Sequence, residues 1–138
     1  MKKILLPGII SGLVISITGM LIGMIFNAIC PSLALEYQNT AIFRPMQDPL
    51  MMIFWLYPFI LGIALAWIWD LTKPILTGAK WQNIAKFALA YFVISQVPGM
   101  LITYSSFQLS LLIVLSWALN GLVNGFIIAF FASLFNKS

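Results

Sequence analysis

Four long apolar segments constrain the fold of this chain more than any other feature of its sequence. They cover approximately residues 7–29, 50–70, 83–104 and 109–135, and no charge lies in the middle of any of them. Each reaches the roughly 20 residues that a helix needs to cross the hydrocarbon core of a bilayer. Only 7% of the 138 residues are charged, whereas water-soluble proteins have roughly 25%. The sequence therefore predicts an all-α membrane protein that is surrounded by a lipid bilayer.

The connections between these segments are too short to hold a separate soluble domain. The first connection is the longest, residues 71–82 form a shorter basic one, and residues 105–108 form a polar turn. Short connections join helices that are antiparallel neighbours. We expect residues 1–138 to form a single integral membrane domain, a four-transmembrane-helix bundle with up-down-up-down topology.

The first segment follows Lys2 and Lys3, as the apolar run of a secretory signal peptide would. Its run is longer than the roughly 7–15 residues of a signal peptide, and no Ala-x-Ala cleavage site follows it. A lipoprotein signal is also disfavoured, because Ile29 precedes Cys30 at a position that needs a small residue. We expect an uncleaved helix.

Lysine and arginine are distributed unequally between the two ends of the predicted bundle. With four spans, all six lysines fall at one end and only Arg44 falls at the other. The lysines are Lys2, Lys3, Lys73, Lys80, Lys86 and Lys137. Because basic loops are retained in the cytoplasm, we predict a protein of the bacterial inner (plasma) membrane. Both termini are then cytoplasmic, and the loop of residues 30–49 is outside.

Small residues recur every three or four positions along the first and fourth segments. They are Gly8, Gly12, Ser16, Gly19 and Gly23 in the first segment, and they include Gly121 and Gly125 in the fourth. Faces of this kind let helix backbones approach closely in lipid. We predict that the first and fourth helices pack against each other through these faces within one chain. The alternative is that one face binds a second copy of the chain or another membrane protein.

The first and third segments share a short pattern. Val14–Ile22 reads VISITGMLI and Val93–Ile102 reads VISQVPGMLI, so that VIS and GMLI match with one residue inserted between them. A duplicated helical hairpin would produce such a match, with the two hairpins related by an axis along the membrane normal. The alternative is chance, because apolar helices use few residue types.

Uncharged polar residues lie near the middle of the third and fourth segments. Gln96 precedes Pro98, which is expected to kink its helix. Asn120 and Asn124 lie one turn apart on one helix face. These residues would line a polar pathway or ligand site at mid-membrane. The alternative, which the general packing of membrane helices favours, is that they form hydrogen bonds between helices.

The stretch from Glu36 to Pro49 holds the only arginine and two of the three acidic residues. Asp48 before Pro49 is typical of a helix start, and Arg44 would pair with Glu36 or Asp48. In this interpretation Glu36 has no capping role. A solvated loop explains most of these residues. The alternative is a ligand site in which Glu36 and Arg44 face Tyr104 over the mouth of the bundle.

Several kinds of chemistry have no support in the sequence. Histidine is absent and Cys30 is the single cysteine, so we predict no metal site and no cofactor. No basic stripe with interleaved aromatic residues is present, so a nucleic-acid partner is not expected. The sequence has no phosphate-binding loop and no nucleophile–base pair, which disfavours an enzyme, and no catalytic residue is assigned.

Three functions remain for a small integral membrane protein. The first is transport or ligand binding at a polar site between the outer mouth and mid-membrane. The residues proposed for that site are Glu36, Arg44, Gln96, Asn120, Asn124 and Tyr104. The second is a structural or accessory subunit that packs through its glycine-rich faces. The third is a membrane-embedded enzyme that modifies a lipid, which would need Glu36 beside Arg44 in a cleft open to lipid.

Overall fold

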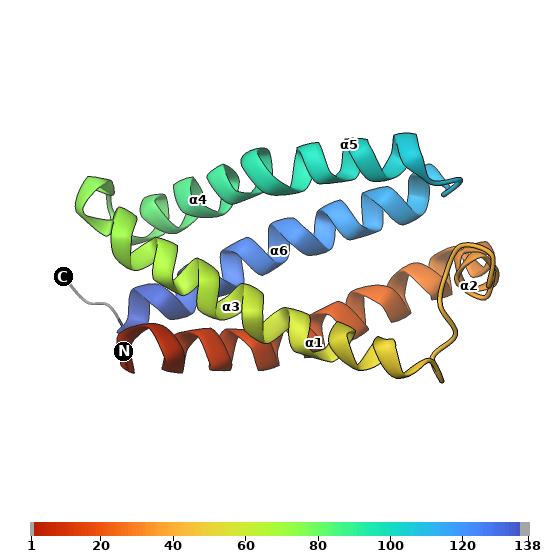
Figure 1. Cartoon of the computed structure of the whole chain (residues 1–138). Coiled ribbons are helices and arrows are strands. Elements are labelled where there is room, and N and C mark those ends of the chain that lie inside the picture. The colour runs from red at the N-terminus through yellow and green to blue at the C-terminus, as the bar shows by residue number, and fades with distance from the viewer. Residues whose placement is uncertain (1, 136–138) are drawn as a thin grey trace.

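The computed structural model describes residues 2–135, and these residues form a helical bundle (Figure 1). The elements are α1 (Lys2–Ile29), α2 (Pro31–Tyr37), η1 (Pro49–Met51), α3 (Met52–Thr72), η2 (Lys73–Ile75), α4 (Lys80–Tyr91), η3 (Phe92–Gln96), α5 (Val97–Ser106) and α6 (Leu111–Phe135). Four spans within the described residues are long and apolar enough to cross a membrane: Lys2–Ile29, Pro49–Ile75, Lys80–Ser106 and Leu111–Phe135. The predicted fold, a four-helix bundle of a small integral membrane protein, is confirmed.

The four spans alternate in direction. The N-terminus and the η2 turn lie at one end of the bundle, whereas α2 and the turn before α6 lie at the other (Figure 1). We name these the inner end and the outer end, after the predicted orientation. Lys73 pairs with Asp70 at the inner end, with 2.7 Å between Nζ and Oδ1. Lys137, which contributed to the predicted orientation, lies outside the described residues.

The closest approach of two backbones is between α1 and α3. A Cβ atom added to Gly8 would lie 2.6 Å from the Cα atom of Ile63, and one added to Gly12 would lie 2.9 Å from the Cα atom of Phe59. A Cβ atom on Gly62 would meet the carbonyl oxygen of Gly8. The prediction that Gly8 and Gly12 pack against the fourth span is therefore wrong. They pack against the second span, because Gly62 leaves room there.

The glycines of α6 make room for the third span. A Cβ atom added to Gly125 would lie 2.9 Å from the ring of Tyr91 and 3.3 Å from the Cα atom of Ala88. One added to Gly121 would overlap the side chain of Gln96. Gly8 and Gly12 of the first span thus have a different partner from Gly121 and Gly125 of the fourth. The spans α1 and α6 are nevertheless in contact, and the predicted packing of these two helices holds at Gly19, which faces α6.

Toward the outer end, α1 and α6 separate. The Ser16 hydroxyl donates to the carbonyl oxygen of Gly12 within α1, at 2.9 Å. A Cβ atom added to Gly19 would lie 3.5 Å from the amide nitrogen of Asn120 on α6. One added to Gly23 would meet no atom of another element within 4 Å among the described residues. The small-residue face of α1 therefore ends at an open space.

The third span contains a π-helical turn, η3, between α4 and α5. The N–H of Val97 donates to the carbonyl oxygen of Phe92, five residues earlier. Such a turn holds one residue more than an α-helical turn, and it precedes Pro98, which has no N–H to donate. The turn coincides with the place where Val93–Ile102 is one residue longer than Val14–Ile22. The duplication itself stays a prediction.

Buried side chains form two clusters. The inner cluster joins α1, α3, α4 and α6 through Ile15, Leu65, Ala66, Trp69, Ile84, Phe87, Tyr91, Ile128, Ala129 and Ala132. The outer cluster contains Leu33 of α2 with Leu109, Ile113 and Val114, and Ile42 and Phe43 pack against it. The sequence suggested a solvated loop here. Leu33 is only 2% exposed, so residues 30–49 are not simply a solvated loop. They fold back onto the outer end of α6.

Candidate functional site

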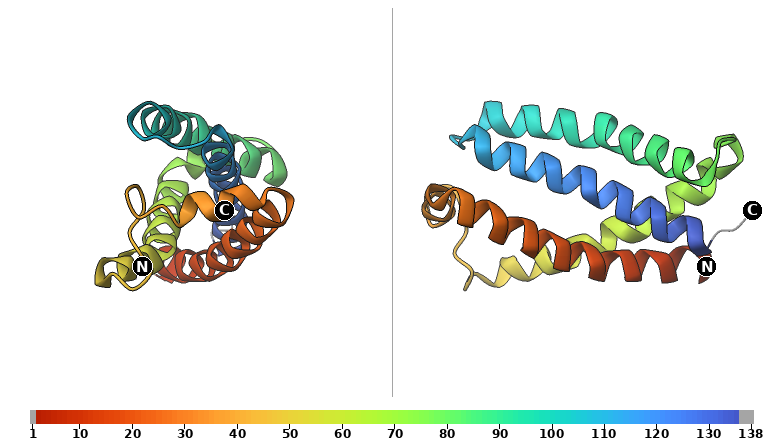
Figure 2. Two further views of the ribbon diagram at one scale, coloured as in Figure 1. Left: turned by 90° about the vertical axis from the view of Figure 1, so that its right-hand side faces the viewer. Right: turned by 180° about the vertical axis from the view of Figure 1, so that it is seen from behind.

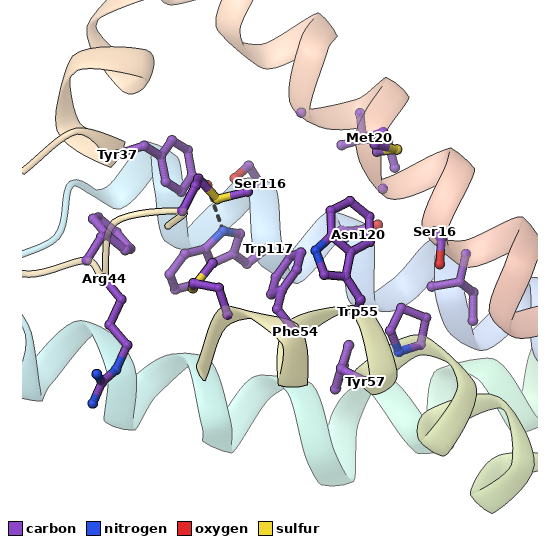
Figure 3. Close-up of a pocket in the computed structure, with 18 of the residues that line it drawn as sticks. Ser16, Met20, Tyr37, Arg44, Phe54, Trp55, Tyr57, Ser116, Trp117 and Asn120 are labelled. Carbon is purple, nitrogen blue, oxygen red and sulfur yellow. Dashed lines mark hydrogen bonds between the residues drawn. The ribbon is translucent and has the colours of Figure 1, made fainter. Parts of the chain in front are cut away.

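A cavity of about 1070 Å³ lies in the outer half of the bundle. Its walls come from α1, α3, the third span, α6 and the loop of residues 30–49 (Figure 3). It extends from Arg44 and Gln47 at the outer mouth to Asn124 in the middle of α6. Binding sites for small molecules usually have volumes of roughly 300–1000 Å³. The cavity is therefore large enough for a lipid-sized or drug-sized molecule.

The walls of the cavity are mainly aromatic and sulfur-containing. They include Tyr37, Phe43, Phe54, Trp55, Tyr57 and Trp117, together with Met20, Met46, Met51 and Met100. In Figure 3, Phe54 and Trp55 of α3 surround the same space as Met20 of α1 and Trp117 of α6. Rigid rings offer large apolar surfaces, and methionine side chains adapt to irregular shapes. Walls of this kind suit the apolar part of a ligand.

Three aromatic residues of α3 both line the cavity and are exposed. Phe54, Trp55 and Tyr57 line it, and they are nevertheless 61%, 46% and 47% exposed. Gln96 and Met100 of the third span line the same cavity. Viewed from the outer end, α3 and α5 stand apart (Figure 2, left).

Two asparagines of α6 form the inner end of the cavity. Asn120 and Asn124 both line it, and Asn124 is only 2% exposed. The amide oxygens of both residues are buried without a hydrogen-bond partner among the described residues. Buried polar side chains normally have a partner, so hydrogen bonding between helices does not account for these two. The described residues supply no partner for these two oxygens.

Gln96 reaches the inner end of the cavity from the π-helical turn. Its Nε2 donates to the hydroxyl of Tyr91 at 2.6 Å, and its side chain fills the space beside Gly121. Gln96 lines the cavity together with Asn120 and Asn124. The three mid-membrane residues that the sequence singled out therefore surround one space. Turns of the π type occur frequently at functional sites.

An aromatic cluster of Tyr37, Phe43 and Trp117 joins the loop of residues 30–49 to α6. The Nε1–H of Trp117 donates to the hydroxyl of Tyr37 at 2.7 Å (Figure 3). The ring centroids of Tyr37 and Phe43 are 5.2 Å apart, and those of Phe43 and Trp117 are 6.2 Å apart. Burial raises the pKa of the Tyr37 phenol more than the hydrogen bond from Trp117 lowers it. The phenol is therefore uncharged at neutral pH, and this part of the wall carries no ion.

Arg44 lines the mouth of the cavity, and its partner is Asp48. The Nη1 atom of Arg44 donates to Oδ2 of Asp48 at 2.8 Å, and the arginine side chain is 61% exposed. The other carboxylate oxygen of Asp48 accepts from the N–H of Leu50 at 2.9 Å, so its predicted role as a helix cap is confirmed. The hydrogen bonds from Leu50 and then Arg44 hold the pKa of Asp48 below its usual value. The rim thus carries a paired charge.

Glu36 has a structural role that the sequence did not reveal. Its Oε1 atom accepts from the N–H of Ser110, 74 positions along the chain, at 2.6 Å. Because Leu111 begins α6, this carboxylate satisfies a free N–H at the positive end of the helix dipole. The interpretation that Glu36 has no capping role was wrong. Neither Glu36 nor Tyr104 lines the cavity, so the expected grouping of Glu36, Arg44 and Tyr104 over the mouth does not form.

The aromatic wall was missed by the sequence analysis. Trp55 resembles the interfacial tryptophans that are common in membrane proteins, and its position beside a cavity depends on how α3 packs. Trp117 did offer a signal, because it lies seven residues into α6, with Asn120 and Asn124 following on the same helix. A tryptophan that shares an apolar span with two amides has a polar tip that needs a partner inside the bundle, which is unlike a surface that faces only lipid.

No group of three or more His, Cys, Asp or Glu side chains within residues 2–135 is arranged to hold a metal ion. Comparisons with known protein families, with curated proteins and with solved structures find no match. Functional inference therefore depends on the geometry of the cavity.

Proposed function

We propose that this small integral membrane protein binds a ligand in the cavity, as a ligand-binding or transport component of its membrane. The supporting observation is the inner end of the cavity, where Asn120 and Asn124 have buried amide oxygens with no partner in the part of the chain that the structure describes. A buried polar group without a partner destabilises a fold by about 1–3 kcal/mol. Residues that cost stability in this way are typical of functional sites.

The difference between the two halves of the bundle also supports this function. The inner half is closed by the inner cluster, in which the rings of Trp69 and Phe87 lie 5.2 Å apart. The outer half holds the cavity, which has its mouth at the outer end. This form admits a ligand from the outer surface or the outer leaflet and blocks passage further inward. A transport cycle would add a second form, in which the inner cluster opens.

The other two functions have less support. An accessory subunit would present its glycine face to a partner, but Gly8, Gly12 and Gly62 pack against elements of the same chain. A lipid-modifying enzyme was expected to hold Glu36 beside Arg44. These two residues instead bind Ser110 and Asp48, and Glu36 does not line the cavity that Arg44 lines. Ligand binding is the function that the described contacts favour.

For the orientation, we propose that both termini lie in the cytoplasm and that the loop of residues 30–49 lies outside. In a Cys30→Ser background, Asn39→Cys at the outer end should react with a membrane-impermeant maleimide on intact cells. Thr77→Cys, which is exposed between η2 and α4, should react only after the membrane is made permeable. The reverse pattern of labelling would overturn the orientation and leave the four spans unaffected.

Filling the cavity should abolish ligand binding without unfolding the protein. Gly23 lines the cavity and has open space around it, so the Gly23→Trp side chain would occupy the space that a ligand needs. We expect this variant to raise the dissociation constant of 1-aminoanthracene, an uncharged fluorescent probe with three fused rings, at least tenfold. Binding is measured in phosphatidylcholine nanodiscs by energy transfer from tryptophan.

Gly99→Trp is the matched control for this experiment. An added side chain at Gly99 also meets open space, and Gly99 does not line the cavity. The control should bind the probe as the wild type does, within about twofold, and both variants should keep the wild-type melting temperature. Equal binding by all three proteins, or saturable binding by none of them, would contradict the proposed function.

A further inference from the structure

We infer that the ligand is an uncharged amphiphile whose head group, an amide or a hydroxyl, binds at the inner end of the cavity between Asn120, Asn124 and Gln96. Its apolar chain would lie along the aromatic wall and leave between α3 and α5. This inference rests on the proposed function and specifies the chemical class of the ligand.

The hydrogen-bonding atoms at the inner end point to the head group. Asn124 is 2% exposed, it lines the cavity, and its amide oxygen has no partner within the described residues. Asn120, one turn away, also has an unpartnered amide oxygen. Each amide group offers both donors and an acceptor. A head group that can both donate and accept, as an amide or a hydroxyl does, complements the two asparagines.

The charges around the cavity exclude an ionic head group at that depth. Within residues 2–135, Arg44 is the only charged side chain that lines the cavity. It lies at the outer mouth, and its guanidinium is bound to Asp48. Gln96, Asn120 and Asn124 are uncharged. An ion placed among them would lose its hydration without gaining a counter-ion, which is unfavourable inside a membrane. The inner end therefore selects a neutral group.

The walls and the exposed aromatic residues of α3 point to an apolar chain on the same molecule. A head group at Asn120 occupies a small part of about 1070 Å³, and Met20, Phe54 and Trp117 surround much of the rest. Phe54 lines the cavity and is nevertheless 61% exposed. A chain that runs along these side chains stays in contact with apolar groups from the cavity to the bilayer.

Displacement of 1-aminoanthracene from the wild-type protein in nanodiscs tests this class of ligand. The competitors are decanamide, decane, decanoate, decylammonium and acetamide, with the concentrations of the membrane-soluble ones given as mole fractions in the bilayer. Decanamide should displace the probe at a concentration at least tenfold lower than the other four. If decane competes as well as decanamide, the asparagines bind only water and the inference is wrong. If acetamide competes as strongly as decanamide, the ligand is a small solute and the assignment of an apolar chain is wrong.

Substitutions at the inner end give the second arm of the test. Asn124→Leu should reduce the preference for decanamide over decane at least tenfold, because the variant no longer offers an amide to the head group. Asn120→Leu should have the same effect, and it replaces Asn124→Leu as the test variant if Asn124→Leu does not fold. Asn27→Leu is the matched control, because the Asn27 amide oxygen is also buried and unpartnered but does not line the cavity. A preference retained in both Asn120→Leu and Asn124→Leu would overturn the inference.

A failure of the assigned ligand class can be distinguished from a failure of the proposed function. If the wild type does not bind 1-aminoanthracene in a saturable way, the proposed function fails. If it binds the probe but responds equally to all the competitors, only the assigned class of ligand fails.

Discussion

Replacing Gly62 with alanine is expected to lower the free energy of unfolding by about 2 kcal/mol, and replacing it with leucine should leave no folded protein. The Cβ atom of Gly62→Ala would meet the carbonyl oxygen of Gly8 and lie 3.3 Å from the backbone nitrogen of Gly12. Both neighbours are backbone atoms, so the contact can be relieved only if α1 and α3 separate. Overpacking of this kind costs about 1–3 kcal/mol, and the helix preference of alanine offsets less than about 1 kcal/mol of it.

Gly99→Ala is the matched control for this prediction. It makes the same chemical change in a transmembrane helix, but its Cβ atom would meet open space. We expect the control to be neutral or slightly stabilising. Unfolding is measured by circular dichroism as a mild detergent is replaced with a denaturing one. Equal stability of Gly62→Ala and the wild type would show that α1 and α3 do not pack as described.

Removal of the Glu36 carboxylate is expected to cost about 2 kcal/mol and to release α2 from the outer end of the bundle. Hydrogen bonds to charged groups contribute about 1.5–3 kcal/mol, and a negative charge at a helix N-terminus contributes about 0.3–1 kcal/mol. Glu36 supplies both through its bond to the N–H of Ser110. Glu36→Gln keeps an acceptor but loses the charge, so it should cost about half as much as Glu36→Ala.

The native cysteine reports on this local change. Cys30 lies at the start of α2 and packs against the outer cluster, so its reaction with a thiol reagent should become faster in Glu36→Ala. Asp70→Asn is the control, because it removes a carboxylate from a partly exposed ion pair at the inner end, where solvent screens the interaction and little stability should be lost. If Cys30 reacts at the same rate in Glu36→Ala as in the wild type, the bond to Ser110 does not hold α2 in place.

The features that could be predicted from the sequence depend on neighbouring residues. Length and hydropathy defined the four spans to within a few residues, since a bilayer requires long uninterrupted apolar helices. Asp48 before Pro49 indicated a helix start, because a capping residue acts on the N–H groups of the first turn that follows it. Gln96, Asn120 and Asn124 attracted attention because polar residues are costly inside apolar spans.

The features that could not be predicted depend on partners far away in the chain. Glycine spacing shows that a face of α1 packs closely, but it does not identify the partner, and Gly8 and Gly12 lie against α3. The carboxylate of Glu36 and the N–H of Ser110 are 74 positions apart, and no local pattern connects them. The cavity also results from the separation of α3 and α5 toward the outer end, so its aromatic wall is a property of the assembled bundle.

The π-helical turn has a consequence for how this chain can vary over evolutionary time. A residue inserted into an α-helix rotates everything beyond it by about 100°, which in α6 would turn Gly121 and Gly125 away from the third span. At Phe92–Gln96 an extra residue is already accommodated as a local bulge, and the helix beyond keeps its face. We therefore expect the loss of one codon to be accommodated at this depth of the third span, where the π-helical turn would become an α-helical one. Such a change would alter which side chain stands beside the asparagines, so that ligand preference can diverge between descendants while the helix contacts stay the same.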